Sequence, residues 1–187
     1  MSDSNSKHVE SDLSYVRSVV DRSERGPSPA PIYLLWAAIV LVGFPLADFA
    51  PAYVGVYWTI MGPLGGVISG VLGWRHSVRL GQVSREIGRR HALHWGGMLA
   101  AIFSVVVLGI TNTVAWEVVH RIILLVIALA YFLAGVHLDR PLLWVGMLVA
   151  VAYFVMFFVT TYAWTIVGVV VSAALVVAAF AGGRERA

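Results

Sequence analysis

The sequence predicts an all-α integral membrane protein, a bundle of six transmembrane helices whose amino and carboxyl termini both lie in the cytoplasm. Three observations support this fold class: 59% of the residues are hydrophobic, 12% are charged, and apolar runs follow one another from residue 32 to residue 182. A soluble domain carries about 25% charged residues, so this chain lacks the polar surface of a water-soluble protein. About 20 apolar residues in a helix cross the ~30 Å hydrocarbon layer of a bilayer.

Six apolar runs approach this length, and all of them lie in one central region between two polar tails. Residues 1–30 form a polar cytoplasmic tail, in which Leu13, Val16 and Val20 can share one face of a short amphipathic helix. Residues 31–182 form the transmembrane domain, and residues 183–187 form a second cytoplasmic tail. The six predicted helices cover residues 32–49, 53–74, 92–111, 114–136, 142–160 and 165–181.

Basic residues decide the predicted orientation, because they resist translocation across the membrane. The connector at residues 75–91 is rich in arginine, whereas the connectors near Pro51, Asn112 and Tyr162 hold no Lys or Arg. With six spans, the basic connector lies on the same side as both termini, so that side is predicted to be cytoplasmic. We expect a multi-pass protein of the bacterial cytoplasmic (inner) membrane. Its arginines are expected to contact anionic lipid headgroups rather than nucleic acid: Arg75, Arg79, Arg85, Arg89 and Arg90.

The second apolar run contains three glycines four residues apart, Gly62, Gly66 and Gly70. This spacing places them on one helix face and allows another helix backbone to approach closely. The pattern predicts packing within the chain, within a homo-oligomer, or against a partner in a membrane complex. Pro63 removes one helical hydrogen bond and is expected to kink the helix, so a hinge beside a substrate path is the alternative.

The fourth apolar run holds the residues that are most costly to place in a membrane: Glu117, His120 and Arg121. Their spacing of i, i+3 and i+4 stacks them on one helix face, where Glu117 and Arg121 can pair. Asp48 ends the first run on the same side of the membrane. The cluster is interpreted either as ion pairs that tie helix ends together or as a site for a ligand, an ion or a proton.

Histidines gather at the opposite, arginine-rich surface. His94 at the start of the third run and His137 at the end of the fourth are predicted to lie at similar depth. Two facing imidazoles can ligate haem iron, and a further histidine would make a site for another metal. Ordinary interfacial histidines are the alternative, and no other cofactor is predicted.

The sequence lacks the patterns that mark common catalytic sites. It contains no phosphate-binding GxxxxGK[ST] loop, no HExxH and no GxSxG, and it has no cysteine. We therefore expect a small non-enzymatic membrane protein. It either binds or passes a small solute or ion through the polar cluster, or it is a membrane subunit of a larger assembly. A haem-bearing electron carrier that uses His94 and His137 is the alternative, and a membrane transferase that uses Asp48 or Glu117 also stays open.

Overall fold

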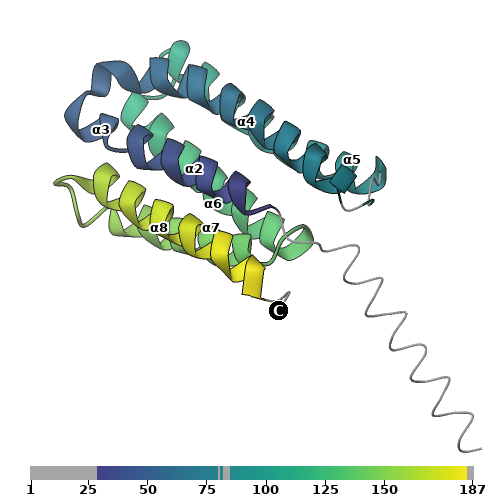
Figure 1. Cartoon of the computed structure of the whole chain (residues 1–187). Coiled ribbons are helices and arrows are strands. Elements are labelled where there is room, and N and C mark those ends of the chain that lie inside the picture. Colours follow the sequence, from purple (N-terminus) through teal and green to yellow (C-terminus); the bar gives the residue numbers. More distant parts are fainter. Residues whose placement is uncertain (1–28, 80, 82–84, 185–187) are drawn as a thin grey trace, which may run out of the picture.

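The computed structural model describes residues 29–79, 81 and 85–184, and the side chains as far as residue 181. The predicted amphipathic segment of the amino tail lies outside the described residues. The described part is helical, with no strand, and its long helices run side by side (Figure 1). In chain order the elements are α2 (Ala30–Gly43), α3 (Leu46–Phe49), the 3-10 helix η1 (Pro51–Tyr53), α4 (Val54–Arg79), α5 (Arg85–Ile110), α6 (Trp116–His137), α7 (Pro141–Val155) and α8 (Ala163–Arg184).

Five segments are long and apolar enough to cross a membrane: Ala30–Phe49, Pro51–Arg79, Arg85–Ile110, Trp116–His137 and Ala163–Ala181. The prediction of a multi-pass, α-helical membrane protein is thereby confirmed. The remaining apolar helix, α7, has 15 residues and is about 22 Å long. Because α7 is shorter than the other candidate spans, the count of six stays a prediction.

Several helix ends differ from the predicted ones. The run at 32–49 is interrupted before Pro45, which has no backbone N–H to continue the ladder, so it forms α2 and α3. Helix α7 ends at Val155 rather than at residue 160. Between these two positions, turns replace the helix in a run of aromatic and β-branched residues. Helix α4, in contrast, is continuous through Pro63.

The arginine-rich segment at 75–91 is mostly an extension of the two helices that flank it. Helix α4 continues to Arg79 and α5 already begins at Arg85, so only residues 80–84 connect them. Glu86 pairs with Arg89 at 3.2 Å and with Arg90 at 3.3 Å, and such i,i+3 and i,i+4 pairs support a helix. The five arginines therefore project from helix ends, and all five are exposed.

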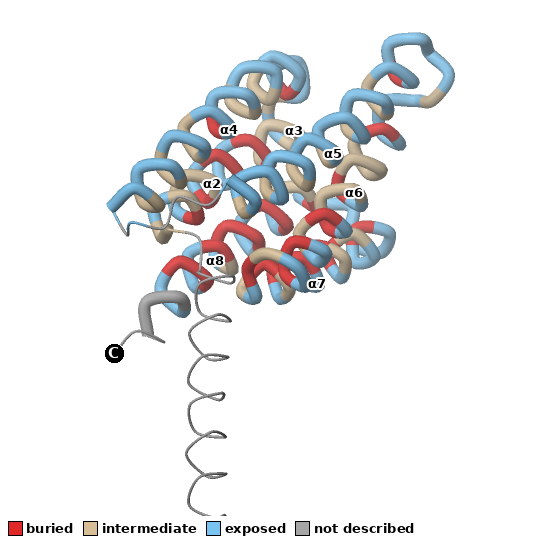
Figure 2. The backbone as a smooth tube through the Cα atoms, turned by 90° about the vertical axis from the view of Figure 1, so that its right-hand side faces the viewer, coloured by how far each residue is buried: buried red, intermediate tan, exposed pale blue. Residues whose placement is uncertain are grey.

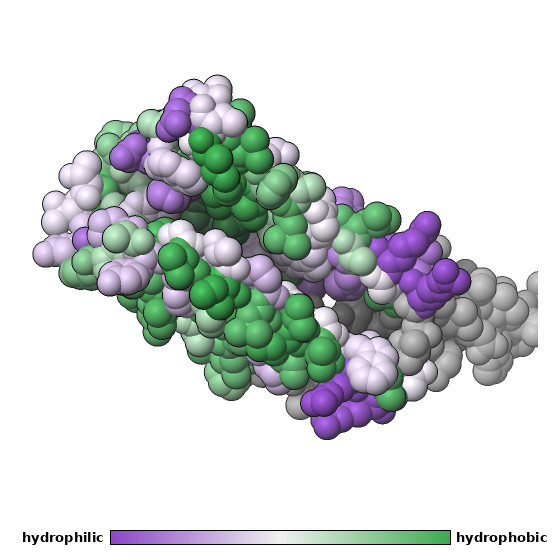
Figure 3. All heavy atoms as spheres, turned by 90° about the horizontal axis from the view of Figure 1, so that it is seen from above, coloured by the Kyte–Doolittle hydropathy of each residue, from purple (hydrophilic) through white to green (hydrophobic). Residues whose placement is uncertain are grey.

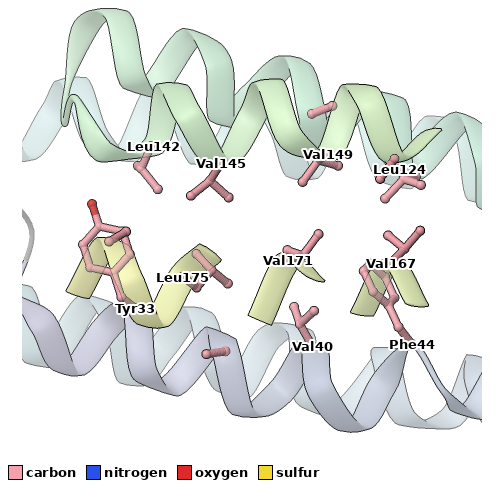
Figure 4. Close-up of a cluster of buried hydrophobic side chains, with 14 of the residues drawn as sticks. Tyr33, Val40, Phe44, Leu124, Leu142, Val145, Val149, Val167, Val171 and Leu175 are labelled. Carbon is pink, nitrogen blue, oxygen red and sulfur yellow. The ribbon is translucent and has the colours of Figure 1, made fainter. Parts of the chain in front are cut away.

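The core lies between α2, α6, α7 and α8. Figure 4 shows its apolar side chains meeting from these helices, and Figure 2 shows that the buried residues concentrate there. Helices α6 and α7 approach closely at two glycines. A Cβ atom on Gly135 would lie 2.1 Å from the backbone N of Leu143, and one on Gly146 would lie 2.3 Å from the backbone N of Phe132. Only glycine fits at these two crossings.

Helices α4 and α5 lie at the periphery. Helix α4 packs on α2 and α5 packs on α6, whereas α4 and α5 make at most marginal contact with each other. In their most apolar windows, 11% of the α4 residues and 6% of the α5 residues are buried, against 44% in α8. Their outward side chains are largely apolar, and Figure 3 shows hydrophobic residues along the helices with hydrophilic ones towards the ends. An apolar surface of this kind is suited to contact with lipid. Helices α4 and α5 thus each have a face that no other part of the described chain covers.

Candidate functional site

Asp48 is placed by α3 against the start of α8. Its Oδ2 atom accepts hydrogen bonds from the backbone N and the Oγ1 of Thr165, both at 2.7 Å. Thr165 is the third residue of α8, so its N–H belongs to the first turn, where it has no partner within the helix. Asp48 therefore caps α8 from a distant part of the chain, and its negative charge is favourable at that end of the helix dipole.

His120 and Arg121 are held by aromatic rings. The His120 ring lies 6.0 Å from the ring of Trp116 and 6.2 Å from that of Trp164, measured between centroids. The Arg121 guanidinium carbon lies 5.1 Å from the centroid of the Phe157 ring, which is within the range of a cation–π contact. Both side chains are half-buried in this aromatic layer.

The structure brings only part of the predicted cluster together. His120 contacts Trp164 and Asp48 binds the adjacent Thr165, so these two groups meet through the first turn of α8. Glu117 is exposed. Among the residues that the structure describes, the ion pairs are those of Glu86, and none joins Glu117 to Arg121. The contacts of Asp48, His120 and Arg121 tie helix ends together, and a ligand role for the cluster stays a prediction.

At the arginine-rich end, His94 and His137 line one pocket of about 400 Å³, together with Arg90, Leu93 and Leu138. The Nε2–H of His94 donates to the backbone carbonyl of Ala130 on α6, at 3.0 Å. This bond fixes the His94 ring and joins α5 to α6. Within the described ranges, no group of three or more His, Cys, Asp or Glu is placed to hold a metal ion. Haem ligation by the two histidines stays a prediction.

Asp139 is a buried acidic residue that the sequence-based reasoning missed. It lies between α6 and α7, is 4% exposed, and its Oδ2 accepts a hydrogen bond from the hydroxyl of Tyr33 on α2. The pair joins α2 to the α6–α7 turn near the arginine-rich end. The available signal was a single acidic residue beside Arg140 in the three-residue connector between α6 and α7, which is the usual pattern of a solvated loop.

On α4, the glycine that packs within the chain is Gly65. A Cβ atom there would lie 2.8 Å from Ile39 on α2, and nearby Trp36 donates to the Ser69 hydroxyl at 3.0 Å. By contrast, a Cβ atom on the predicted packing glycines Gly62, Gly66 and Gly70 would meet nothing within 4 Å. These three glycines belong to a longer row of small residues on one face of α4, here called the small-residue face. Its members follow one another at spacings of three or four positions: Gly55, Thr59, Gly62, Gly66, Gly70, Gly73 and Ser77.

Three features thus stand out for function: the aromatic layer around His120, the basic pocket at His94 and His137, and the small-residue face of α4. The first is a set of side chains that contact one another, the second is an open pocket, and the third is an uncovered helix surface. Comparisons with protein-family models, with curated proteins and with solved structures found no match to this chain.

Proposed function

We propose that this protein is a non-enzymatic subunit of a membrane assembly, and that the partner at its small-residue face is a second copy of the chain. The observation that carries the proposal is that most of this face is uncovered. The row from Gly55 to Ser77 extends for about 33 Å, close to the thickness of the hydrocarbon layer. Its uncovered stretch runs from Gly55 to Gly70, about 22 Å, because a Cβ atom on Gly73 would lie 3.9 Å from Ile32. The four central and outer glycines of the row have nothing within 4 Å of an added Cβ atom: Gly55, Gly62, Gly66 and Gly70.

A row of small residues has a specific use in lipid. Association there depends on close backbone packing, because lipid tails are as apolar as the side chains. Two copies in one membrane have the same orientation, so their α4 helices can pair in parallel around a two-fold axis. Arg75 lies nine positions, about 2.5 turns, after Gly66, and thus on the opposite side of α4. The paired faces therefore bring no like charges together.

The core gives less support to passage of a solute. Among the described residues, its buried polar or charged side chains are Asp139 and Ser172. The Ser172 hydroxyl donates to the carbonyl of Ala37 at 2.9 Å, and Asp139 accepts from Tyr33. A hydrated path needs a row of polar groups that face one another, whereas these two are satisfied by neighbouring helices. We therefore favour assembly over transport.

The orientation proposed for this subunit places the arginine-rich end in the cytoplasm of a bacterial cell. Arg75, Arg79, Arg85, Arg89 and Arg90 all lie at that end, whereas the opposite end of the described chain holds Arg121 alone among Lys and Arg. Excess Lys and Arg mark the cytoplasmic side of inner-membrane proteins. With this orientation, Asp48, Glu117, His120 and Arg121 face the outer side.

Disulfide cross-linking in native membranes tests the assembly directly. The chain has no cysteine, so a single introduced cysteine reports on one position. Gly66→Cys lies on the small-residue face, and Leu64→Cys lies at nearly the same depth but about 160° around the helix. With iodine as a membrane-permeant oxidant, we expect a dimer-sized product for Gly66→Cys and little for Leu64→Cys. Equal yields from both variants, or none from Gly66→Cys, would contradict pairing through this face.

An electron carrier is the second candidate, because His94 and His137 line the same pocket. Ligation of iron by Nε2 of His94 requires that nitrogen to give up its bond to Ala130. The function predicts a Soret band in the purified protein that is lost in His94→Ala. Colourless protein from haem-replete cells excludes it.

A further inference from the structure

The pocket at the arginine-rich end is lined by one arginine, two histidines and two leucines. Arg90, Leu93 and His94 come from the first turns of α5, and His137 and Leu138 from the end of α6. Its volume of about 400 Å³ lies within the range of sites for small ligands. The predicted span in α5 begins at residue 92 and the predicted span in α6 ends at residue 136, so the predicted membrane boundary places the pocket at the depth of the lipid headgroups.

The hydrogen-bond donors of the pocket have capacity for an anion. Arg90 uses its Nε atom to contact Glu86, at 3.3 Å. In the described part of the chain no other acceptor engages its guanidinium, so the terminal nitrogens remain for a ligand. The His137 side chain is exposed. The nearest acidic neighbour in sequence, Asp139, is directed to Tyr33 on α2.

We propose that this pocket binds the phosphate group of an anionic phospholipid. A guanidinium presents two parallel N–H donors that match two phosphate oxygens, and an imidazole adds a further donor. Leu93 and Leu138 provide the apolar contact that the glycerol and upper acyl chain of a lipid need. Basic pockets between helices at the cytoplasmic surface are suited to such headgroups. The proposal is independent of self-association through α4, because the pocket is formed by α5 and α6.

A specific pocket differs from a general attraction between arginines and lipid, and Arg89 and Arg90 distinguish the two. Both arginines contact Glu86, at 3.2 Å and 3.3 Å, and both side chains are exposed, at 67% and 59%. Only Arg90 lines the pocket. Diffuse electrostatics requires the two to contribute about equally, whereas a pocket requires Arg90 to dominate.

The experiment is native mass spectrometry of the full chain in detergent, titrated with phosphatidylglycerol, with phosphatidylcholine, or with inorganic phosphate. We expect one tightly retained phosphatidylglycerol per chain and weaker retention of phosphatidylcholine, whose ammonium cancels the phosphate charge. Arg90→Gln should lower the affinity by about tenfold, and Arg89→Gln by less than about threefold. His137→Gln should weaken binding as well.

Each outcome has a defined meaning. Inorganic phosphate is the second possible ligand. If it binds, displaces the lipid and loses affinity in Arg90→Gln, the pocket is a phosphate site, and its ligand is a soluble phosphate rather than a lipid. Equal losses in Arg89→Gln and Arg90→Gln would overturn the pocket in favour of diffuse surface charge. Absence of any retained phosphatidylglycerol or phosphate by the wild-type chain would overturn it as well. Because both arginines are exposed, both variants are expected to elute like wild type in size exclusion.

Discussion

At the scale of single residues, two acidic side chains are held at helix ends by partners far away in the sequence. Asp48 binds the first turn of α8, and Asp139 binds Tyr33. A carboxylate near the hydrocarbon layer is costly unless its oxygens accept hydrogen bonds. In both cases the partners come from other helices, so the carboxylates fix how those helices pack.

The cap at α8 predicts a loss of stability in Asp48→Ala. This substitution removes both acceptor contacts to Thr165 and should lower the free energy of unfolding by about 1–2 kcal/mol. Asp48→Asn keeps one oxygen and should cost less. Intrinsic tryptophan fluorescence during thermal unfolding in detergent measures the change. Glu117→Ala is the control, because Glu117 is exposed and without an ion pair among the described residues, and a loss there as large as in Asp48→Ala contradicts the assignment.

The buried contact to Asp139 predicts a similar effect in Tyr33→Phe. The variant keeps the ring but removes the hydroxyl donor, so a buried carboxylate loses one hydrogen bond at a cost of about 1–3 kcal/mol. Tyr53→Phe is the matched control, because Tyr53 is 66% exposed. Chemical unfolding of both variants in detergent measures the difference. Unchanged stability in Tyr33→Phe would show that the hydroxyl contributes nothing to the fold.

At the scale of helices, hydropathy predicted the class and the approximate position of each segment, but not the helix ends. Helix ends depend on individual residues that a hydropathy window averages out. Pro45 interrupts the first run, and the pairs around Glu86 extend α5 beyond the apolar part. Asp139 was missed for a related reason: its burial depends on Tyr33, more than 100 positions earlier, and no local pattern records that contact.

Glycine spacing likewise does not reveal which glycine is packed. The α6 backbone packs directly against Gly146, whereas a Cβ atom added to Gly66 would meet no atom within 4 Å. We expect Gly146→Ala to destabilise the protein by about 3 kcal/mol or more, because the added Cβ overlaps backbone atoms that cannot rotate away. Gly66→Ala should leave the monomer unchanged or slightly more stable, since alanine favours the helix by about 1 kcal/mol. Thermal unfolding of both variants in detergent, at a dilution where the chain is monomeric, checks this contrast, and equal effects would contradict the described packing of α6 on α7.

At the scale of the whole molecule, a closed apolar core of four helices carries two peripheral helices whose outer faces are uncovered. The core packs within a single chain, and α4 and α5 present faces that no other part of the described chain covers. We propose separate partners for separate surfaces: a second copy for the small-residue face of α4, and a phosphate group for the pocket of α5 and α6.

Copy number in a gently extracted particle tests the central claim most directly. Native mass spectrometry of the wild-type chain should show a dimer, and Gly66→Leu should show a monomer, because the larger side chain blocks the face while the Cβ atom that it adds meets nothing within 4 Å in the monomer. Leu64→Ala, on the other side of α4, should stay dimeric. A monomeric wild-type chain, or a Gly66→Leu variant that is as dimeric as wild type, would contradict assembly through α4.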